Sequence, residues 1–414
     1  METVEERRSL PEVIKSLVKI LVIVGIIIGA GFLMKFLFDS YMESKRTIPT
    51  PENNVAIANK QLEKYNPIYM MRDPGGPEGD APLIDYNVLG CRFTGYLGPT
   101  KSGVFNEDAA VNLALRAGCR VFCLNIGTVD AIDGPVLVVR TGNGDLISNN
   151  VGSINKVCQA LERHSTTRDP IIIFLYFNRL PSVNMYSPET MKFMMNVATG
   201  LQPLRNRHLG LTSEGDYRRQ KMQDTLFLRS RSLFDGKFII LTNVDTSGFR
   251  PGVLPSNKGI PEINPNNDLD LWTNARISTY TSVSLGLTTP PKLSTASGPR
   301  VETVDYFMGI GESGMVQAIG NSAVNWTIAM NNAPDYEPIP PNKLDKMLDK
   351  TGVACVLVDV FTDGLFADNM ILSKKYFGKS GWRLKPEGLR YVKPKEEKIG
   401  AQNPQANTST RIAF

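Results

Sequence analysis

A thiol and a carboxamide stand two residues apart in one apolar segment of the sequence. The segment GCRVFCLNIG spans residues 118–127 and is predicted to form a buried strand that presents Cys123 and Asn125 near its end. Neither side chain offers the anionic oxygens that a hard metal cation prefers. An uncharged pair at this place therefore argues against metal-assisted chemistry there.

Groups that could handle an anion or a proton lie elsewhere in the sequence. Arg140, near the end of PVLVVRTG, could contact an anion, but a guanidinium cannot act as an acid near neutral pH. The two histidines, His164 and His208, are predicted to be exposed residues at a helix end or in a loop. Four carboxylates near late strand ends could serve a rebuilt hydrolytic site, although turns and helix caps are their commoner role: Asp305, Glu312, Asp359 and Asp363.

Short β-branched segments alternate with helical patterns from Asn87 onward, which is the order of a β/α fold. Several of these segments are continuously apolar, as is typical of parallel strands covered on both faces. Helical spacing of apolar residues in 153–164 predicts a flanking helix with Ser153 as its N-cap. One or two short strands are expected in 275–283. The other predicted strands begin at Asn87, Arg120, Pro135, Pro170, Lys237 and Ala354.

One long apolar segment lies near the N-terminus, in residues 17–38, with a lysine near each end. At about 1.5 Å per residue, such a helix can cross a hydrocarbon core of about 30 Å. A signal peptide is the alternative, but its apolar core is usually only about 7–15 residues long. We therefore expect a single-pass membrane anchor that contacts the lipid bilayer through residues such as Leu17, Ile20, Ile26, Phe32 and Phe38.

Composition narrows the possible partners. The five cysteines are odd in number and widely spaced, which predicts reduced core residues and no zinc motif. The basic stretch Arg205–Arg231 lacks interleaved aromatic residues, so we expect a solvated face and no nucleic-acid partner. No phosphate-binding or dinucleotide-binding loop is present, and no cofactor is expected. The predicted organisation is a tail (1–16), a transmembrane helix (17–38), a Pro/Gly-rich stalk (39–86), a folded domain (87–392) and a polar tail (393–414).

Five segments resemble, in order and rough spacing, the landmarks of phosphatidylinositol-specific phospholipase C catalytic domains. The resemblance covers about Asn87 to Tyr391. It implies an α/β fold, a distorted TIM-type (β/α)8 barrel of the PLC-like phosphodiesterase kind, with chemistry at the C-terminal ends of the strands. The segments are LRAGCRVFCLN, PVLVVRTG, DPIIIFLYFN, FDGKFIILTN and GWRLKPEGLR.

The sequence departs from that family at each diagnostic polar position. The resemblance places Phe93 on a catalytic histidine, and it places Cys123 and Asn125 on two acidic calcium ligands. The second histidine falls on Val139 or Arg140. The degenerate positions are Phe93, Thr94, Cys123, Asn125, Val139, Arg140, Tyr176 and Asn178. We therefore expect a catalytically degenerate member with no catalytic residue and no metal, and hence no enzyme.

These observations predict a membrane-anchored, catalytically inactive phospholipase C-like domain that acts as a structural tether or interaction module. A protein partner is expected, and one fitting setting is the link between the membrane and the capsid of a large DNA virus. Two alternatives stay open. One is a non-catalytic receptor for an inositol phosphate or lipid headgroup, using Arg140 with Arg218, Arg219 and Lys221. The other is a divergent phosphodiesterase with a rebuilt active site.

Overall fold

The chain divides into two compact units, Met1–Thr50 and Pro51–Phe414. Asp363, the basic residues at 218–221 and the predicted polar tail lie outside the described residues. The computed structural model describes residues 10–45, 56, 81–98, 103–130, 132–140, 146, 148, 150–165, 169–182, 184, 186–210, 225–249, 262–279, 299–331, 339, 341–359 and 381–392.

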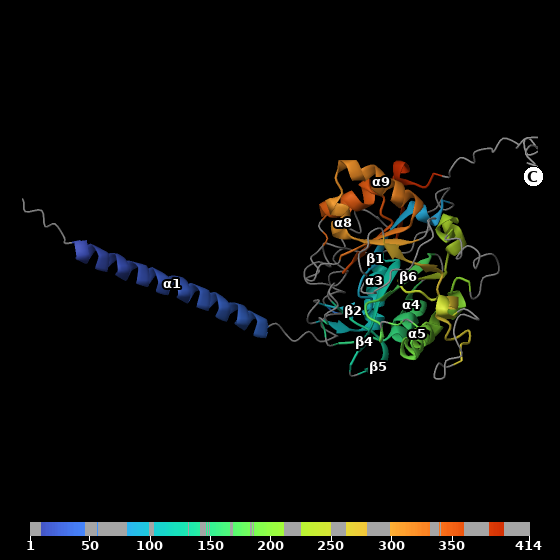
Figure 1. The fold of residues 1–414 in the computed structure, drawn as a ribbon, viewed down its shortest axis with the longest axis horizontal. Helices are drawn as coiled ribbons and strands as arrows, with labels where there is room; N and C mark the ends of the chain where they lie inside the picture. Colours follow the sequence, from blue (N-terminus) through green and yellow to red (C-terminus); the bar gives the residue numbers. More distant parts are fainter. Residues whose placement is uncertain are drawn as a thin grey trace, which may run out of the picture. The chain divides into compact units, whose positions relative to one another are not determined.

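The first unit consists of one long helix, α1 (Leu10–Lys45), drawn in blue in Figure 1. It includes Leu17–Phe38, a stretch of 22 residues that is long and apolar enough to cross a membrane and of which none is buried in the protein. A signal sequence near an N-terminus can meet the same criteria of length and composition. The apolar N-terminal helix that the sequence predicts is therefore present.

Parallel strands form the core of the second unit, in the spatial order β8-β7-β6-β4-β1-β12-β11-β10-β9. Only Ile277 separates β8 from β9, so the chain itself joins the two ends of this order and closes a barrel. The distorted TIM-type fold class is thereby confirmed. The strands are β1 (Tyr86–Cys91), β4 (Val121–Val129), β6 (Ile171–Phe177), β7 (Phe238–Thr242), β8 (Ala275–Arg276), β9 (Ser278–Thr279), β10 (Arg300–Thr303), β11 (Thr327–Met330) and β12 (Cys355–Val358).

Helices cover the outside of the barrel, with α3, α4 and α5 side by side and α8 and α9 near β10 and β11 (Figure 1). The predicted N-cap is confirmed, since the Ser153 hydroxyl accepts a hydrogen bond from the Lys156 amide. The helices are α3 (Glu107–Arg116), α4 (Ile154–His164), α5 (Pro188–Gly200), α7 (Leu269–Trp272), α8 (Val304–Gly309), α9 (Glu312–Val324) and α10 (Pro341–Asp345). Single turns lie at Leu83–Asp85, Gln202–Arg207, Leu226–Leu228, Arg231–Phe234, Ser247–Phe249, Lys346–Lys350 and Glu387–Leu389.

The segment that begins at Pro135 does not become a parallel strand of the barrel. It forms the end of β5 (Ile132–Leu137), which pairs antiparallel with β4. The connection between Val129 and Ile132 is too short for a parallel crossover, which needs a dozen or more residues. The other strands outside the ring are β2 (Tyr96–Leu97), β3 (Val104–Phe105) and β13 (Trp382–Leu384), the last antiparallel to β1.

Strand alternation divides the core into two layers. Cys123, Ile172 and Phe174 belong to the cluster inside the barrel, while Phe122 and Ile173 pack outward against the helices. Because both faces are covered, β6 is buried along its whole length, as its unbroken apolar sequence predicts. The five cysteines are free and buried, also as predicted.

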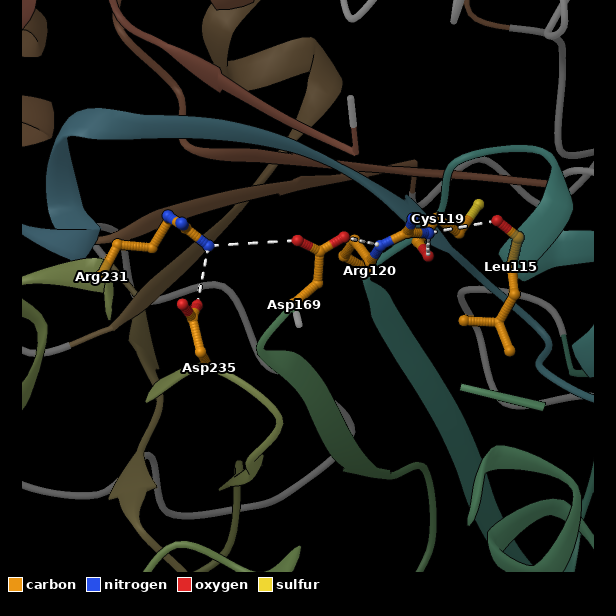
Figure 2. Close-up of polar contacts among 6 residues, drawn as sticks. All are labelled: Leu115, Cys119, Arg120, Asp169, Arg231 and Asp235. Atoms are coloured by element: carbon orange, nitrogen blue, oxygen red, sulfur yellow. Dashed lines mark hydrogen bonds and ion pairs between the residues drawn. The ribbon is translucent and has the colours of Figure 1, made fainter. Parts of the chain in front are cut away.

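A buried charge network lies at the floor of the barrel, the end where the parallel strands begin. Figure 2 shows Asp169 between two guanidinium groups, with its Oδ2 2.9 Å from Nε of Arg120 and its Oδ1 3.9 Å from Nη1 of Arg231. Arg231 also pairs with Asp235 at 2.9 Å. Arg231 is 1% exposed, so the prediction of a solvated face for 205–231 is wrong at this residue.

The chain enters the barrel through this floor. The amide of Arg231 donates to the Ala81 carbonyl, and the amide of Leu83 donates to the Arg229 carbonyl. On the other side, the Asp85 carboxylate accepts from the Tyr391 amide at 2.6 Å. The segment that leads into β1 is therefore held between two other parts of the chain.

Candidate functional site

The mouth of the barrel, where the parallel strands end, brings a guanidinium and a carboxyl together. Strands β1 and β12 are adjacent, with Cys91 opposite Val358, and the amide of Arg92 donates to the Val358 carbonyl at 2.9 Å. Arg92 and Asp359 are the next residues of these two strands. Arg92 is 3% exposed, and its guanidinium donates to the Asn331 carbonyl.

Asp359 is the titratable group of the mouth. Desolvation by burial raises the pKa of its carboxyl to about 6, against the opposing effect of the Arg92 charge. A proton-transferring group works best when its pKa lies near the working pH. Asp359 therefore has the acid–base property that the degenerate family positions lack.

Cys123 and Tyr176 lie beside this pair but hold their protons. Burial raises the pKa of each to about 12, although the Arg92 charge lowers both. The Cys123 thiol donates to Oδ1 of Asn125 at 3.2 Å. Because the thiolate is the nucleophilic form of cysteine and the soft ligand for metals, this thiol has neither role near neutral pH.

Two amide groups leave hydrogen-bond donors to spare in the mouth. Asn125, opposite Tyr176 in the sheet register, is 2% exposed, and its Nδ2 is buried without a partner among the described residues. The same holds for Nδ2 of Asn178 at the end of β6. A buried donor without an acceptor is costly in free energy, so spare donors beside Arg92 favour an anionic ligand.

The remaining predicted positions of the first strand end are structural. Phe93 is 5% exposed and packs in a small apolar cluster with Tyr96 and Val139. Thr94 donates its hydroxyl to the Cys91 carbonyl at 3.4 Å and its amide to the Cys123 carbonyl at 3.2 Å. These side chains shape the rim and offer no acid or base.

Arg140, the predicted anion contact, lies further along the β4–β5 hairpin. It is 8% exposed, and its Nη2 donates to the Thr128 carbonyl at 2.8 Å. It lies over Gly127, where a Cβ would come within 3.6 Å of its Nε. The main chain of β4 thus already engages the guanidinium beyond the layer that holds Asn125.

The other predicted residues do not gather at this site. The prediction that His208 is exposed is wrong, because it is fully buried, with its Nε2 2.7 Å from the Trp272 carbonyl and its ring against Trp272. His164 ends α4, with its Nε2 2.9 Å from Oδ1 of Asp108. Asp305 and Glu312 are exposed residues in the first turns of α8 and α9.

A calcium site, which the phospholipase C resemblance would imply, does not fit the described mouth. Calcium takes about six to eight oxygen ligands, several of them carboxylates. The described part of the mouth supplies Asp359, which already faces a guanidinium, and a protonated thiol at Cys123. Nowhere in the described residues do three or more His, Cys, Asp or Glu residues gather as a metal site would require.

Sequence reasoning missed Arg92, the residue that organises the mouth. The available signal was a charged residue within the strand-like segment NVLGCRF, since an arginine there must be either at the strand end or paired. Asp359 was named as one of four carboxylates near late strand ends, without a partner for its charge at this mouth. The register of β1 against β12 is what joins the two residues.

Comparisons with known proteins agree with this architecture. No protein-family model matches the chain, and no curated protein matches it. Among solved structures, PLC21 of L. pealei has a TM-score of 0.51 at 13% identity, covering 75% of this chain and 38% of its own. PLC21 of S. officinalis gives a TM-score of 0.50 at 13% identity with the same coverage. The chain thus spans about two fifths of these proteins and has the PLC-like phosphodiesterase fold.

A third similar structure is a calcium-dependent phosphoinositol-specific phospholipase C from the Gram-negative bacterium Pseudomonas sp. It is 11% identical with a TM-score of 0.38, and the match covers 76% of this chain and 98% of that one.

The prediction that the chain is no enzyme is wrong. The PLC21 proteins of L. pealei and S. officinalis share its fold, and an identity of 13% gives no ground for inferring a loss of activity. The prediction assumed that a mouth without the family's catalytic residues has no other group for acid–base chemistry. Arg92, which the prediction did not consider, lies there beside Asp359, which the prediction had assigned only to the alternative of a rebuilt site.

Proposed function

We propose that the chain is a phosphodiesterase that binds an anionic phosphate diester in the mouth of its barrel and uses Asp359 to transfer protons. The observation that carries this proposal is the carboxyl of Asp359, with a pKa raised to about 6, beside the buried cation of Arg92. Strongly shifted acid groups beside a charge partner in a concave site are frequent at catalytic centres. The spare donors of Asn125 and Asn178 support an anionic substrate.

The chemistry follows from these groups. The Asp359 carboxylate accepts the proton of an attacking hydroxyl, either from water or from the substrate alcohol, while that oxygen bonds to phosphorus. The bond from phosphorus to the leaving oxygen breaks, and the leaving oxygen takes a proton from the newly protonated Asp359 or from water. Arg92 and the Asn125 amide offset the negative charge on the phosphoryl oxygens during the exchange.

A membrane tether forms the second part of the proposal. The apolar stretch Leu17–Phe38 has no buried residues within the protein, which supports its role as a bilayer anchor. An anchored barrel could also connect the membrane to a protein layer. A protein partner and a virion setting stay predictions.

Turnover by the full-length chain in detergent tests the catalytic part. Phosphatidylinositol in mixed micelles and a soluble glycerophosphodiester would serve as substrates. The readout is the released phosphate monoester, formed when water attacks, or the cyclic phosphodiester, formed when a substrate hydroxyl attacks. We expect Asp359→Asn to lower turnover by about 10²–10⁴-fold, the usual contribution of a general acid–base group. The matched control is Asp305→Asn, which removes an exposed carboxylate and should leave the rate unchanged.

The outcome separates the proposal from its main competitor. Phosphate binding that Arg92→Met abolishes, without turnover of either substrate, would support a non-catalytic phosphate receptor at the same mouth. Absence of both binding and turnover would remove the proposal.

A further inference from the structure

Phe93 has a backbone conformation that phenylalanine rarely adopts. It is the one non-glycine residue with positive φ in the described part of the chain, at φ 45°. The left-handed region is unfavourable for a residue with a side chain, because Cβ crowds the following carbonyl. Such strain persists only where the surroundings enforce it, and it is frequent at functional sites.

Neighbouring contacts hold this conformation in place. The Tyr96 amide donates to the Phe93 carbonyl at 3.0 Å, and the Thr94 amide donates to the Cys123 carbonyl at 3.2 Å. The turn therefore closes directly after β1 and is fastened to β4. The Phe93 ring is buried against Tyr96 and Val139.

The strained turn brings the ring to the guanidinium of the preceding residue. Cζ of Arg92 lies 4.9 Å from the centroid of the Phe93 ring, within the range of a cation–π contact. The same guanidinium donates to the Asn331 carbonyl. The ring and the carbonyl together restrict a side chain that would otherwise be long and flexible.

We propose that Phe93 is a positioning residue whose ring holds the Arg92 guanidinium toward the phosphate site of the mouth. This inference rests on the proposed function, since it assigns a task within that site. Phe93 itself does not touch the reacting atoms. In this arrangement Phe93, which the resemblance places on a histidine, positions the Arg92 guanidinium that binds the phosphate.

Binding of inorganic phosphate to the full-length protein in detergent, followed by calorimetry, is the first test. We expect Phe93→Leu to weaken binding by about 3- to 10-fold, which is the fold-change that a cation–π contact in a partly desolvated site supplies. Phe93→Tyr keeps the ring and should retain wild-type binding. Phe93→Gly removes the ring but suits the positive φ, so it should bind as weakly as Phe93→Leu while relieving the strain.

Phe105→Leu is the matched control. Phe105 packs edge-on against Tyr96 in the same cluster, with ring centroids 5.1 Å apart. This variant loses a comparable aromatic ring from the cluster and should leave phosphate binding unchanged. Equal weakening by Phe105→Leu and Phe93→Leu would overturn the proposal, because it would show a general loosening of the rim.

A second readout does not depend on phosphate. The apparent pKa of Asp359, followed by carbon NMR of its carboxyl, responds to the position of the Arg92 charge, with Cys123 and Tyr176 staying protonated nearby. Phe93→Leu should raise this pKa and Phe93→Tyr should not. If the wild type binds no phosphate, the proposed function fails, and an unchanged Asp359 titration in Phe93→Leu would overturn the positioning role separately.

Discussion

Nε of Arg120 lies 2.9 Å from Oδ2 of Asp169, and both side chains are almost completely buried at the floor of the barrel. The pair joins the residue before β4 to the turn before β6, and Arg231 extends it toward the segment before β7 (Figure 2). Arg120 also donates to the carbonyls of Leu115 and Cys119. The network thus connects the starts of three consecutive strands.

Asp169→Asn should lower the free energy of unfolding by about 3–5 kcal/mol, because it leaves buried guanidinium charge poorly compensated. Urea unfolding followed by circular dichroism measures the loss. The control is Asp108→Asn, which breaks an exposed pair with Arg163 and should cost under about 1 kcal/mol. Similar losses in the two variants would mean that the floor network contributes no more than a surface ion pair.

Asp359→Asn should stabilise the fold at pH 7 and lose this advantage toward pH 4. The folded pKa of about 6 lies above the ordinary value of 3.8, so the folded state binds the proton more tightly. The wild type therefore gains stability as the pH falls through 6, whereas the asparagine variant does not. Unfolding free energies of both proteins between pH 4 and pH 7 test the sign, and a pH-independent difference would contradict the raised pKa.

Lys385→Met should flatten the alkaline rise in stability. Burial lowers the pKa of Lys385 to about 7 from its ordinary value of 10.5, against the effect of Asp85. Between these values the unfolded chain binds more protons, so wild-type stability rises with pH. The difference between Lys385→Met and wild type, measured from pH 7 to pH 10, should show this slope. As a control, Lys156→Met replaces an exposed lysine, and its stability difference from wild type should not change with pH.

Ile172→Asp should prevent folding, because it places a charge inside the barrel on a strand that is buried on both faces. Circular dichroism and amide NMR dispersion report the loss. Ile132 is 39% exposed on β5, and Ile132→Asp should leave the spectra unchanged. A folded Ile172→Asp protein would mean that β6 is not the central strand described above.

Removing Met1 to Phe38 should release a soluble domain with the melting temperature of the full chain, since the second compact unit begins at Pro51. Flotation with lipid vesicles should separate the two proteins, with only the full chain rising. Aggregation of the shortened chain would contradict an independently folded barrel.

The long apolar strands and the helix after Ser153 could be predicted from sequence because their patterns are local. Two barrel strands were missed, β10 (Arg300–Thr303) and β11 (Thr327–Met330), since neither lies in a β-branched apolar segment like the one that revealed the equally short β12. The segment at Pro135 was predicted as a strand, but its antiparallel direction depends on a short turn that strand composition does not reveal.

The candidate site was harder to predict than the fold. Cys123 and Tyr176 lie inside the barrel and Phe93 packs at its rim, but the chemistry that we propose depends on Arg92 and Asp359. These residues are more than 260 positions apart in the sequence, and only the pairing of Cys91 with Val358 brings them together. His208 was predicted to be exposed and is buried. A single sequence does not distinguish a buried histidine that contacts a main-chain carbonyl from an exposed one.

The attachment of Ala81 and Leu83 to the segment before β7 has a mechanical consequence. Tension arriving along the chain from the direction of α1 would be borne first by those main-chain bonds and by the ion network under them. Arg92 and Asp359 lie at the opposite ends of the strands, away from those bonds. A load applied at Ala81 would therefore act on the floor of the barrel first and on its mouth last.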